Sequence, residues 1–189
     1  HRGGMGLYPE ESLDAMLNSV KLGVTTLEMD LCISQDGVVM LSHDPYFHHR
    51  YATRPDGTPV MSGDEKVFLY QMPYSEIVKW DVGLKYNEGW PEKKCVPAVK
   101  PVAAEVIKAV EQYTKDNGLA PMYYNIEIKS SEREGEGILW PEYHEFTDKC
   151  MAVLESLDLG DRLVIQCFDE RALNYINEKY PGHRLSFLW

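Results

Sequence analysis

The sequence predicts an α/β fold, in which helices cover a mostly parallel sheet. From residue 101 to the end of the chain, helical and strand patterns of apolar residues alternate. Each interval between two strands is long enough for a helix, and this order is typical of parallel strands. The chain has 189 residues, of which 44% are hydrophobic, so it can form one domain around a single core.

The first expected element is a helix that follows Pro9. Ser12 is a residue type that begins helices, and Gly23 is one that ends them. Between these positions, apolar residues recur at the spacing of one helix face, at Leu13, Met16, Leu17 and Val20. We therefore expect a helix between Ser12 and Gly23.

Two strands and a tight turn come next. Residues 24–31 alternate in polarity and residues 38–41 are apolar, with Asp36-Gly37 between them. The connection is too short for a crossover helix, so an antiparallel hairpin is the expected arrangement. If Asp36 and Gly37 are the two loop residues, Asp30 lies opposite His43.

The middle of the chain is irregular, whereas the remainder is regular. Residues 44–100 are rich in Pro, Gly and aromatic residues, and only residues 75–80 show a short helical pattern. We expect this segment to form an insertion or lid. The elements expected after it are a helix from Pro101 to Gly118, a strand over 122–129, a loop over 130–137, a helix that ends at Gly160, a strand over 163–168, a helix from Asp169 to Pro181 and a strand from Leu185.

Chain length distinguishes between two kinds of parallel sheet. A complete eight-stranded barrel needs about 250 residues, and this chain supplies only about five or six strands. An open doubly wound sheet fits the length, but the Gly-rich phosphate turn that usually follows its first strand is absent. We therefore expect a TIM-type (β/α)8 barrel, seen here as a fragment that lacks the last strands. Residues 1–189 would form a single domain, incomplete at both ends, with the insertion at about 44–100.

Acidic side chains are in excess. Lys and Arg total 19 against 30 Asp and Glu, and the formal net charge is -11. Such a charge disfavours nucleic acid and anionic membrane surfaces as partners. The sequence has no run of about 18 apolar residues, so we expect no stable membrane span. Compartment and oligomeric state stay open, and we favour a periplasmic or exported location over a cytoplasmic one.

Charged residues occur on strands that are otherwise apolar. Glu28 and Asp30 are two positions apart and point to one face, as do Glu127 and Lys129 on the strand over 122–129. A barrel interior accepts carboxylates when something pairs with them. Three carboxylates are hard oxygen ligands, so Glu28, Asp30 and Glu127 are predicted to bind Ca²⁺ or Mg²⁺. The alternative for Glu28 and Asp30 is an edge strand with a solvated face.

Two histidines lie where strands are expected to give way to loops, the positions that form the active face of a barrel. His1 precedes Arg2-Gly3, and His43 precedes Asp44-Pro45. Two imidazoles beside a metal could serve as general acid and general base. Arg2 could bind a phosphate in a bidentate way, and Lys129 could neutralise charge beside it. Hydrogen-bonded structural histidines and structural salt bridges are the alternatives.

Several short motifs occur in an order typical of one enzyme family. They are His1-Arg2-Gly3, Pro9-Glu10-Glu11-Ser12, the segment from Gly23 through Glu28-Met29-Asp30 and Asp36-Gly37 to His43-Asp44, Asn125-Ile126-Glu127-Ile128-Lys129, and Gln166-Cys167-Phe168-Asp169. On these motifs the chain resembles glycerophosphodiester phosphodiesterases of the phospholipase-C-like barrel superfamily, over nearly its whole length. That family usually has Asn and Thr where Glu11 and Ser12 stand, and Ser where Cys167 stands.

The resemblance implies a function and roles for the same residues. It implies metal-dependent hydrolysis of a glycerophosphodiester to sn-glycerol 3-phosphate and an alcohol, with attack by the neighbouring glycerol hydroxyl. His1 and His43 would be the acid and base pair, and Arg2 and Lys129 the phosphate contacts. The implied metal ligands are Glu28, Asp30 and Glu127. Two alternatives are a phospholipase-type phosphodiesterase that acts on intact lipid head groups and a non-catalytic barrel that binds a phosphorylated ligand.

Overall fold

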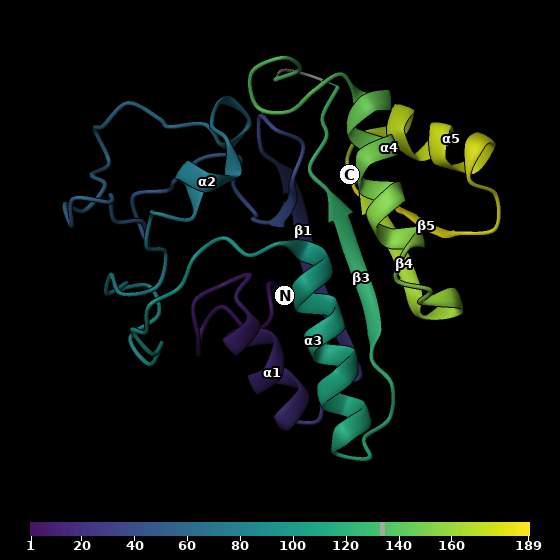
Figure 1. Cartoon of the computed structure of the whole chain (residues 1–189), viewed down its shortest axis with the longest axis horizontal. Helices are drawn as coiled ribbons and strands as arrows, with labels where there is room; N and C mark the ends of the chain where they lie inside the picture. Colours follow the sequence, from purple (N-terminus) through teal and green to yellow (C-terminus); the bar gives the residue numbers. More distant parts are fainter. Residues whose placement is uncertain (133–134) are drawn as a thin grey trace.

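The computed structural model of the chain describes residues 1–132 and 135–189, and within these residues five strands form one sheet. The order across the sheet is β2-β1-β3-β4-β5, with β1, β3, β4 and β5 parallel and β2 antiparallel at the edge (Figure 1). The strands are β1 (Thr26–Ile33), β2 (Val39–Leu41), β3 (Tyr123–Ile128), β4 (Leu163–Cys167) and β5 (Arg184–Phe187). The loop expected over 130–137 includes residues 133–134, which lie outside the described residues.

Four helices pack against one face of the sheet. They are α1 (Leu13–Lys21), α3 (Ala103–Asp116), α4 (Tyr143–Glu155) and α5 (Glu170–Lys179). Their apolar faces meet strand residues such as Met29, Ile126 and Ile165 in the main core. Alternate strand positions point to the opposite face, which in a barrel is the interior. The fold therefore places its polar strand residues on the inner face.

Capping residues explain where two of these helices begin. The Ser12 side chain accepts a hydrogen bond from the backbone N–H of Ala15 at 3.1 Å, and Asp169 accepts one from Arg171 at 3.1 Å. Both contacts satisfy a donor that the first helical turn leaves free. The helix starts expected at Ser12 and Asp169 are thus confirmed.

The β1–β2 hairpin is confirmed, but its expected register is wrong by one residue. Leu31 pairs with Leu41 and Ile33 with Val39, so Ser42 rather than His43 lies opposite Asp30. The backbone N–H of Ser42 donates to the Asp30 carbonyl oxygen at 2.9 Å. The loop has three residues instead of two, because Gly37 takes a φ of 82° and closes a hairpin of the three-residue type.

Residues 44–100 have a small core of their own. Phe47 stacks on Trp80 with ring centroids 4.1 Å apart, and both pack with Cys32 of β1 and Met40 of β2. The regular elements in this segment are a 3-10 turn, η1 (Leu69–Gln71), and a single-turn helix, α2 (Tyr74–Ile77). Outside the segment, a second 3-10 turn, η2 (Gly160–Arg162), directly precedes β4. In Figure 1 the segment lies on the opposite side of β1 from α4 and α5. None of the helices in the described residues is long and apolar enough to cross a membrane.

Candidate active site

Strand register brings the three predicted metal ligands together. Asp30 on β1 is the direct neighbour of Glu127 on β3, and Glu28 lies one inward position earlier on β1. One oxygen from each carboxylate lies within 4.8 Å of the others. Asp30 is 0% and Glu127 6% exposed, so water screens this cluster poorly.

Asp30 is the least compensated carboxylate of the buried cluster. Both carboxylate oxygens of Asp30 are buried and accept no hydrogen bond from any residue that the structure describes. Burial, together with the charges of Glu28 and Glu127, raises the pKa of Asp30 to about 7, against the opposing charge of Lys129. Buried carboxylate oxygens without donors suit a hard divalent cation, because such ions take several oxygen ligands. The residues present therefore fit Ca²⁺ or Mg²⁺.

Two cations border the cluster. The Lys129 ammonium lies 2.7 Å from Glu127 Oε1 and 3.6 Å from Asp30 Oδ1. Burial lowers the pKa of Lys129, but these two carboxylates outweigh that effect and the pKa is raised. The Arg2 guanidinium lies 3.1 Å from Glu10 Oε1 and 4.0 Å from Asp30 Oδ2. Arg2 and Lys129 thus stand beside the cluster.

Hydrogen bonds orient the third predicted ligand, Glu28, from two directions. The backbone N–H of Arg2, which has a left-handed φ of 51°, donates to Glu28 Oε2 at 2.6 Å. Gln166 Nε2 donates to Glu28 Oε1 at 3.2 Å. Asn125 Nδ2 in turn donates to Gln166 Oε1 at 2.9 Å, so the neighbouring strands β3 and β4 orient a side chain of β1.

The two histidines face each other. The rings of His1 and His43 meet edge to face with centroids 6.5 Å apart. His43 Nδ1 lies 3.2 Å from Asp44 Oδ1, and the Tyr51 hydroxyl donates to Asp44 Oδ2 at 3.1 Å. Burial raises the pKa of Asp44, but the hydrogen bond and charge of His43 outweigh it and lower the pKa to about 2. Asp44 is therefore a carboxylate at neutral pH and can fix the orientation of His43.

A buried lysine, Lys100, lies close to Asp44 and contacts it through Ser42. Lys100 is 5% exposed, and its ammonium donates to Ser42 Oγ, which donates to the Asp44 carbonyl oxygen at 2.6 Å. The ammonium also lies 5.2 Å from the centre of the Tyr51 ring. Burial lowers the pKa of Lys100. Its buried charge therefore acts on Asp44, the partner of His43.

Sequence reasoning assigned no role in the site to several of these residues. Asp44 and Glu10 lie within the motifs that carry the family resemblance, and the position of Asp44 directly after His43 was an available signal, whereas the pairing of Glu10 with Arg2 joins residues eight positions apart. Lys100 gave no signal, because its partner Ser42 lies 58 positions earlier in the chain.

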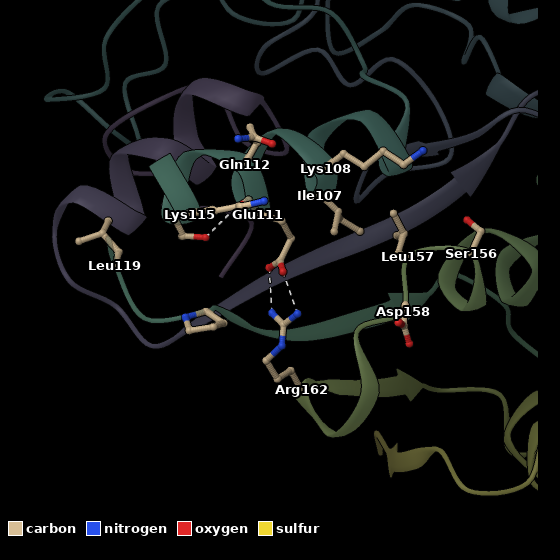
Figure 2. A pocket seen from close by; sticks show the side chains of 12 residues that line it. Ile107, Lys108, Glu111, Gln112, Lys115, Leu119, Ser156, Leu157, Asp158 and Arg162 are labelled. Carbon is tan, nitrogen blue, oxygen red and sulfur yellow. Dashed lines mark hydrogen bonds and ion pairs between the residues drawn. The ribbon is translucent and has the colours of Figure 1, made fainter. Parts of the chain in front are cut away.

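A large cavity in the described residues lies elsewhere. It measures about 830 Å³ and is lined by α3, by the residues that directly follow α4 and by Arg162 of η2. Figure 2 shows Arg162 reaching across it to form two contacts with Glu111, both at 2.7–2.8 Å. Lys108 and Lys115 on its rim are exposed. This cavity contains none of the predicted site residues.

Comparison with known sequences places the chain among phosphodiesterases. The sequence profile of the glycerophosphoryl diester phosphodiesterase family matches residues 1–189. A glycerophosphodiester phosphodiesterase of Caldanaerobacter subterraneus subsp. tengcongensis is 23% identical over 189 residues, and one of Bacillus altitudinis is 24% identical over 188 residues. Both alignments cover 100% of this chain but only 65% and 64% of the relatives, so the chain spans less than two thirds of their length.

Solved structures support the fold. A structure from Silicibacter pomeroyi, assigned as a glycerophosphoryl diester phosphodiesterase, has a TM-score of 0.86 at 22% identity, covering 100% of this chain and 63% of its own. A phosphodiesterase from Oleispira antarctica, in complex with the product sn-glycerol-3-phosphate, has a TM-score of 0.71 at 23% identity, covering 99% and 63%. These likenesses confirm the α/β class and the expected partial (β/α)8 barrel. Because the family profile spans every residue from the first histidine to the last strand, the chain belongs to the glycerophosphoryl diester phosphodiesterase family.

Proposed function

We propose that the protein containing this chain hydrolyses glycerophosphodiesters to sn-glycerol 3-phosphate and an alcohol, with Ca²⁺ or Mg²⁺ as cofactor. The observation that carries the proposal is the facing pair of His1 and His43, joined through Arg2 to a buried carboxylate cluster. A barrel that only binds a phosphorylated ligand needs no acid and base pair. The names of the relatives and the product bound to the Oleispira antarctica structure support the same chemistry.

The side chains around the cluster would bind and polarise the phosphate. Glu28, Asp30 and Glu127 would hold the cation, which when bound stabilises negative charge on phosphoryl oxygens. Arg2 and Lys129 bind oxygens of the same phosphate, since both are cations directed at this cluster. Their charges act strongly here because the cluster is buried.

The two imidazoles would move the protons. One takes a proton from the attacking hydroxyl, while the other gives a proton to the oxygen of the leaving alcohol as its bond to phosphorus breaks. With the Nδ1 proton of His43 directed at Asp44, Nε2 is the nitrogen that exchanges a proton with substrate. The family resemblance supports the neighbouring glycerol hydroxyl as the nucleophile, followed by opening of a cyclic phosphate by water. A substrate without that hydroxyl would then resist cleavage.

Release of sn-glycerol 3-phosphate by the full-length protein tests the proposal. The substrates are glycerophosphocholine, glycerophosphoethanolamine and glycerophosphoglycerol, each with Ca²⁺, with Mg²⁺ and with chelator. We expect release that requires a divalent cation and falls at least about 100-fold in Glu28→Gln and His43→Asn. His183→Asn is the matched control, because His183 lies 3.6 Å from Glu155 and outside the cluster, and its activity should equal that of the wild type.

Two results would overturn the proposal. Faster cleavage of detergent-dispersed phospholipid than of its deacylated product would favour the phospholipase-type enzyme. Tight binding of sn-glycerol 3-phosphate by a folded, metal-loaded protein that cleaves no diester would favour the binding barrel. The exported or periplasmic location stays a prediction, which cell fractionation of the source organism would test.

A further inference from the structure

A fourth carboxylate lies beside the predicted metal ligands. Glu11 is 3% exposed and adopts a φ of 60°, which non-glycine residues rarely take. Its Oε2 accepts a long hydrogen bond, 3.4 Å, from the backbone N–H of Asp30. The local backbone thus holds the Glu11 side chain against the strand that carries Glu28 and Asp30.

The Glu11 carboxylate is poorly compensated. Its Oε1 is buried and has no hydrogen-bond partner in the part of the chain that the structure describes. The carboxylates of Asp30 and Glu28 act on it with like charge, and the Glu11 and Asp30 carboxyls can hydrogen-bond to each other only when one of them is protonated. The buried Lys100 ammonium is a positive charge that also acts on Glu11. Asp169 shows the contrast, because this equally buried carboxylate receives hydrogen bonds from Arg171 and from Ser130 at 2.7–3.0 Å.

The neighbouring Glu10 differs from Glu11 although the two are adjacent in sequence. Glu10 Oε1 pairs with the Arg2 guanidinium at 3.1 Å, so its charge is already matched. Glu11 and Asp30, by contrast, both present buried oxygens without a donor toward the same region. Two such carboxylates side by side are strongly unfavourable unless a cation or a proton lies between them.

We propose that Glu11 is a fourth carboxylate of the cation centre and strengthens its binding of a divalent cation. The inference rests on the proposed metal-dependent function. Glu28, Asp30 and Glu127 form the cluster, and Glu11 adds a fourth negative side chain next to it, at the backbone of Asp30. The cations beside Asp30 itself are Arg2 and Lys129. Hard cations bind more tightly as the number of charged oxygen groups around them rises.

The test is direct cation binding by the full-length protein, without substrate. Wild type and Glu11→Gln are titrated by calorimetry with Ca²⁺ alone and with Mg²⁺ alone. Glutamine keeps the shape of the side chain and an oxygen for the Asp30 N–H but removes the charge. We expect the affinity for the tighter-binding ion to fall at least about tenfold in Glu11→Gln.

Glu10→Gln is the matched control, because it removes a charge from the same segment that Arg2 already compensates. Its cation affinity should change less than about threefold. Thermal unfolding provides a second readout that distinguishes charge from structure. With chelator, Glu11→Gln should melt at the same temperature as the wild type or higher, because one of several like charges has been removed. When the ion is added, the rise in melting temperature should be smaller in Glu11→Gln than in the wild type.

The outcomes separate this inference from the proposed function. Wild-type binding with an equal affinity in Glu11→Gln overturns the role of Glu11 and leaves the function intact, and it indicates a protonated Glu11. A Glu11→Gln protein that melts lower both with and without the ion shows a purely structural role and also overturns the inference. A wild type that binds neither ion overturns the metal dependence itself, together with the inference.

Discussion

Replacement of Asp44 by Asn should weaken the fold and the acid–base pair at once. The Asp44 side chain is 19% exposed, and the hydrogen bond and charge of His43 lower its pKa from 3.8 to about 2, against the effect of burial. At about 1.4 kcal/mol per pKa unit, the difference between the folded and unfolded pKa of Asp44 corresponds to roughly 2 kcal/mol of folding free energy. Because the pKa is depressed in the folded state, that stability is present above about pH 4 and is lost as the pH falls through about 2.

The assay is urea unfolding of wild type and Asp44→Asn across this pH range. We expect the variant to be about 2 kcal/mol less stable near pH 7, with the difference closing toward about pH 2. Its turnover should fall about 100-fold or more, since an amide no longer favours the Nδ1–H form of His43. Asp116→Asn, at the exposed end of α3, is the control. A stability difference that is absent near neutral pH, or unchanged down to about pH 2, would refute the reasoning.

Three further substitutions test other parts of the structure. Tyr124→Phe removes the 2.6 Å hydrogen bond from the Tyr124 hydroxyl to Glu111, the carboxylate that Figure 2 shows paired with Arg162. The free energy of unfolding, measured in urea, should drop by about 1–2 kcal/mol while turnover stays unchanged. A variant as stable as the wild type would contradict this. Lys100→Met removes a buried ammonium, and burial already lowers the pKa of that lysine, so the variant should melt no lower than the wild type. Its turnover should fall at least about threefold, because the contact of Lys100 with Ser42 is lost. An unchanged turnover would exclude a role of Lys100 in positioning Asp44. Gly83→Ala places a Cβ against the carbonyl oxygen of Val96. The melting temperature should therefore fall, and limited proteolysis within residues 44–100 should become faster. Cleavage at the wild-type rate would show that the backbone adjusts to the added Cβ.

Local patterns were sufficient to predict most helices and strands and which charged residues share one face of a strand. The two-residue period of a strand places Glu28 and Asp30 on one face whatever the rest of the fold does. Helix starts at Ser12 and Asp169 follow from chemistry within three residues of each position. Such signals are short in range, so a single sequence carries them fully.

Features that depend on distant partners could not be predicted in the same way. The hairpin register was wrong because a two-residue and a three-residue loop both suit Asp36-Gly37, and only the position of Gly37 in the structure distinguishes them. The burial of Lys100 depends on the packing of residues 44–100 against β1 and β2. Glu11 directly precedes the helix start at Ser12 in sequence, and its proximity to Asp30 is visible only once the chain folds back on β1.

The negative charge of the chain bears on how its site would bind an anion. An acidic protein with a formal charge of -11 repels an anionic phosphodiester at long range, so binding depends on a local excess of positive charge. Arg2 and Lys129 supply two charges, but carboxylates engage both of them, at 3.1 Å from Glu10 and 2.7 Å from Glu127. Anion binding at this site therefore requires further positive charge, and the unpartnered oxygens of Asp30 mark where a divalent cation would provide it.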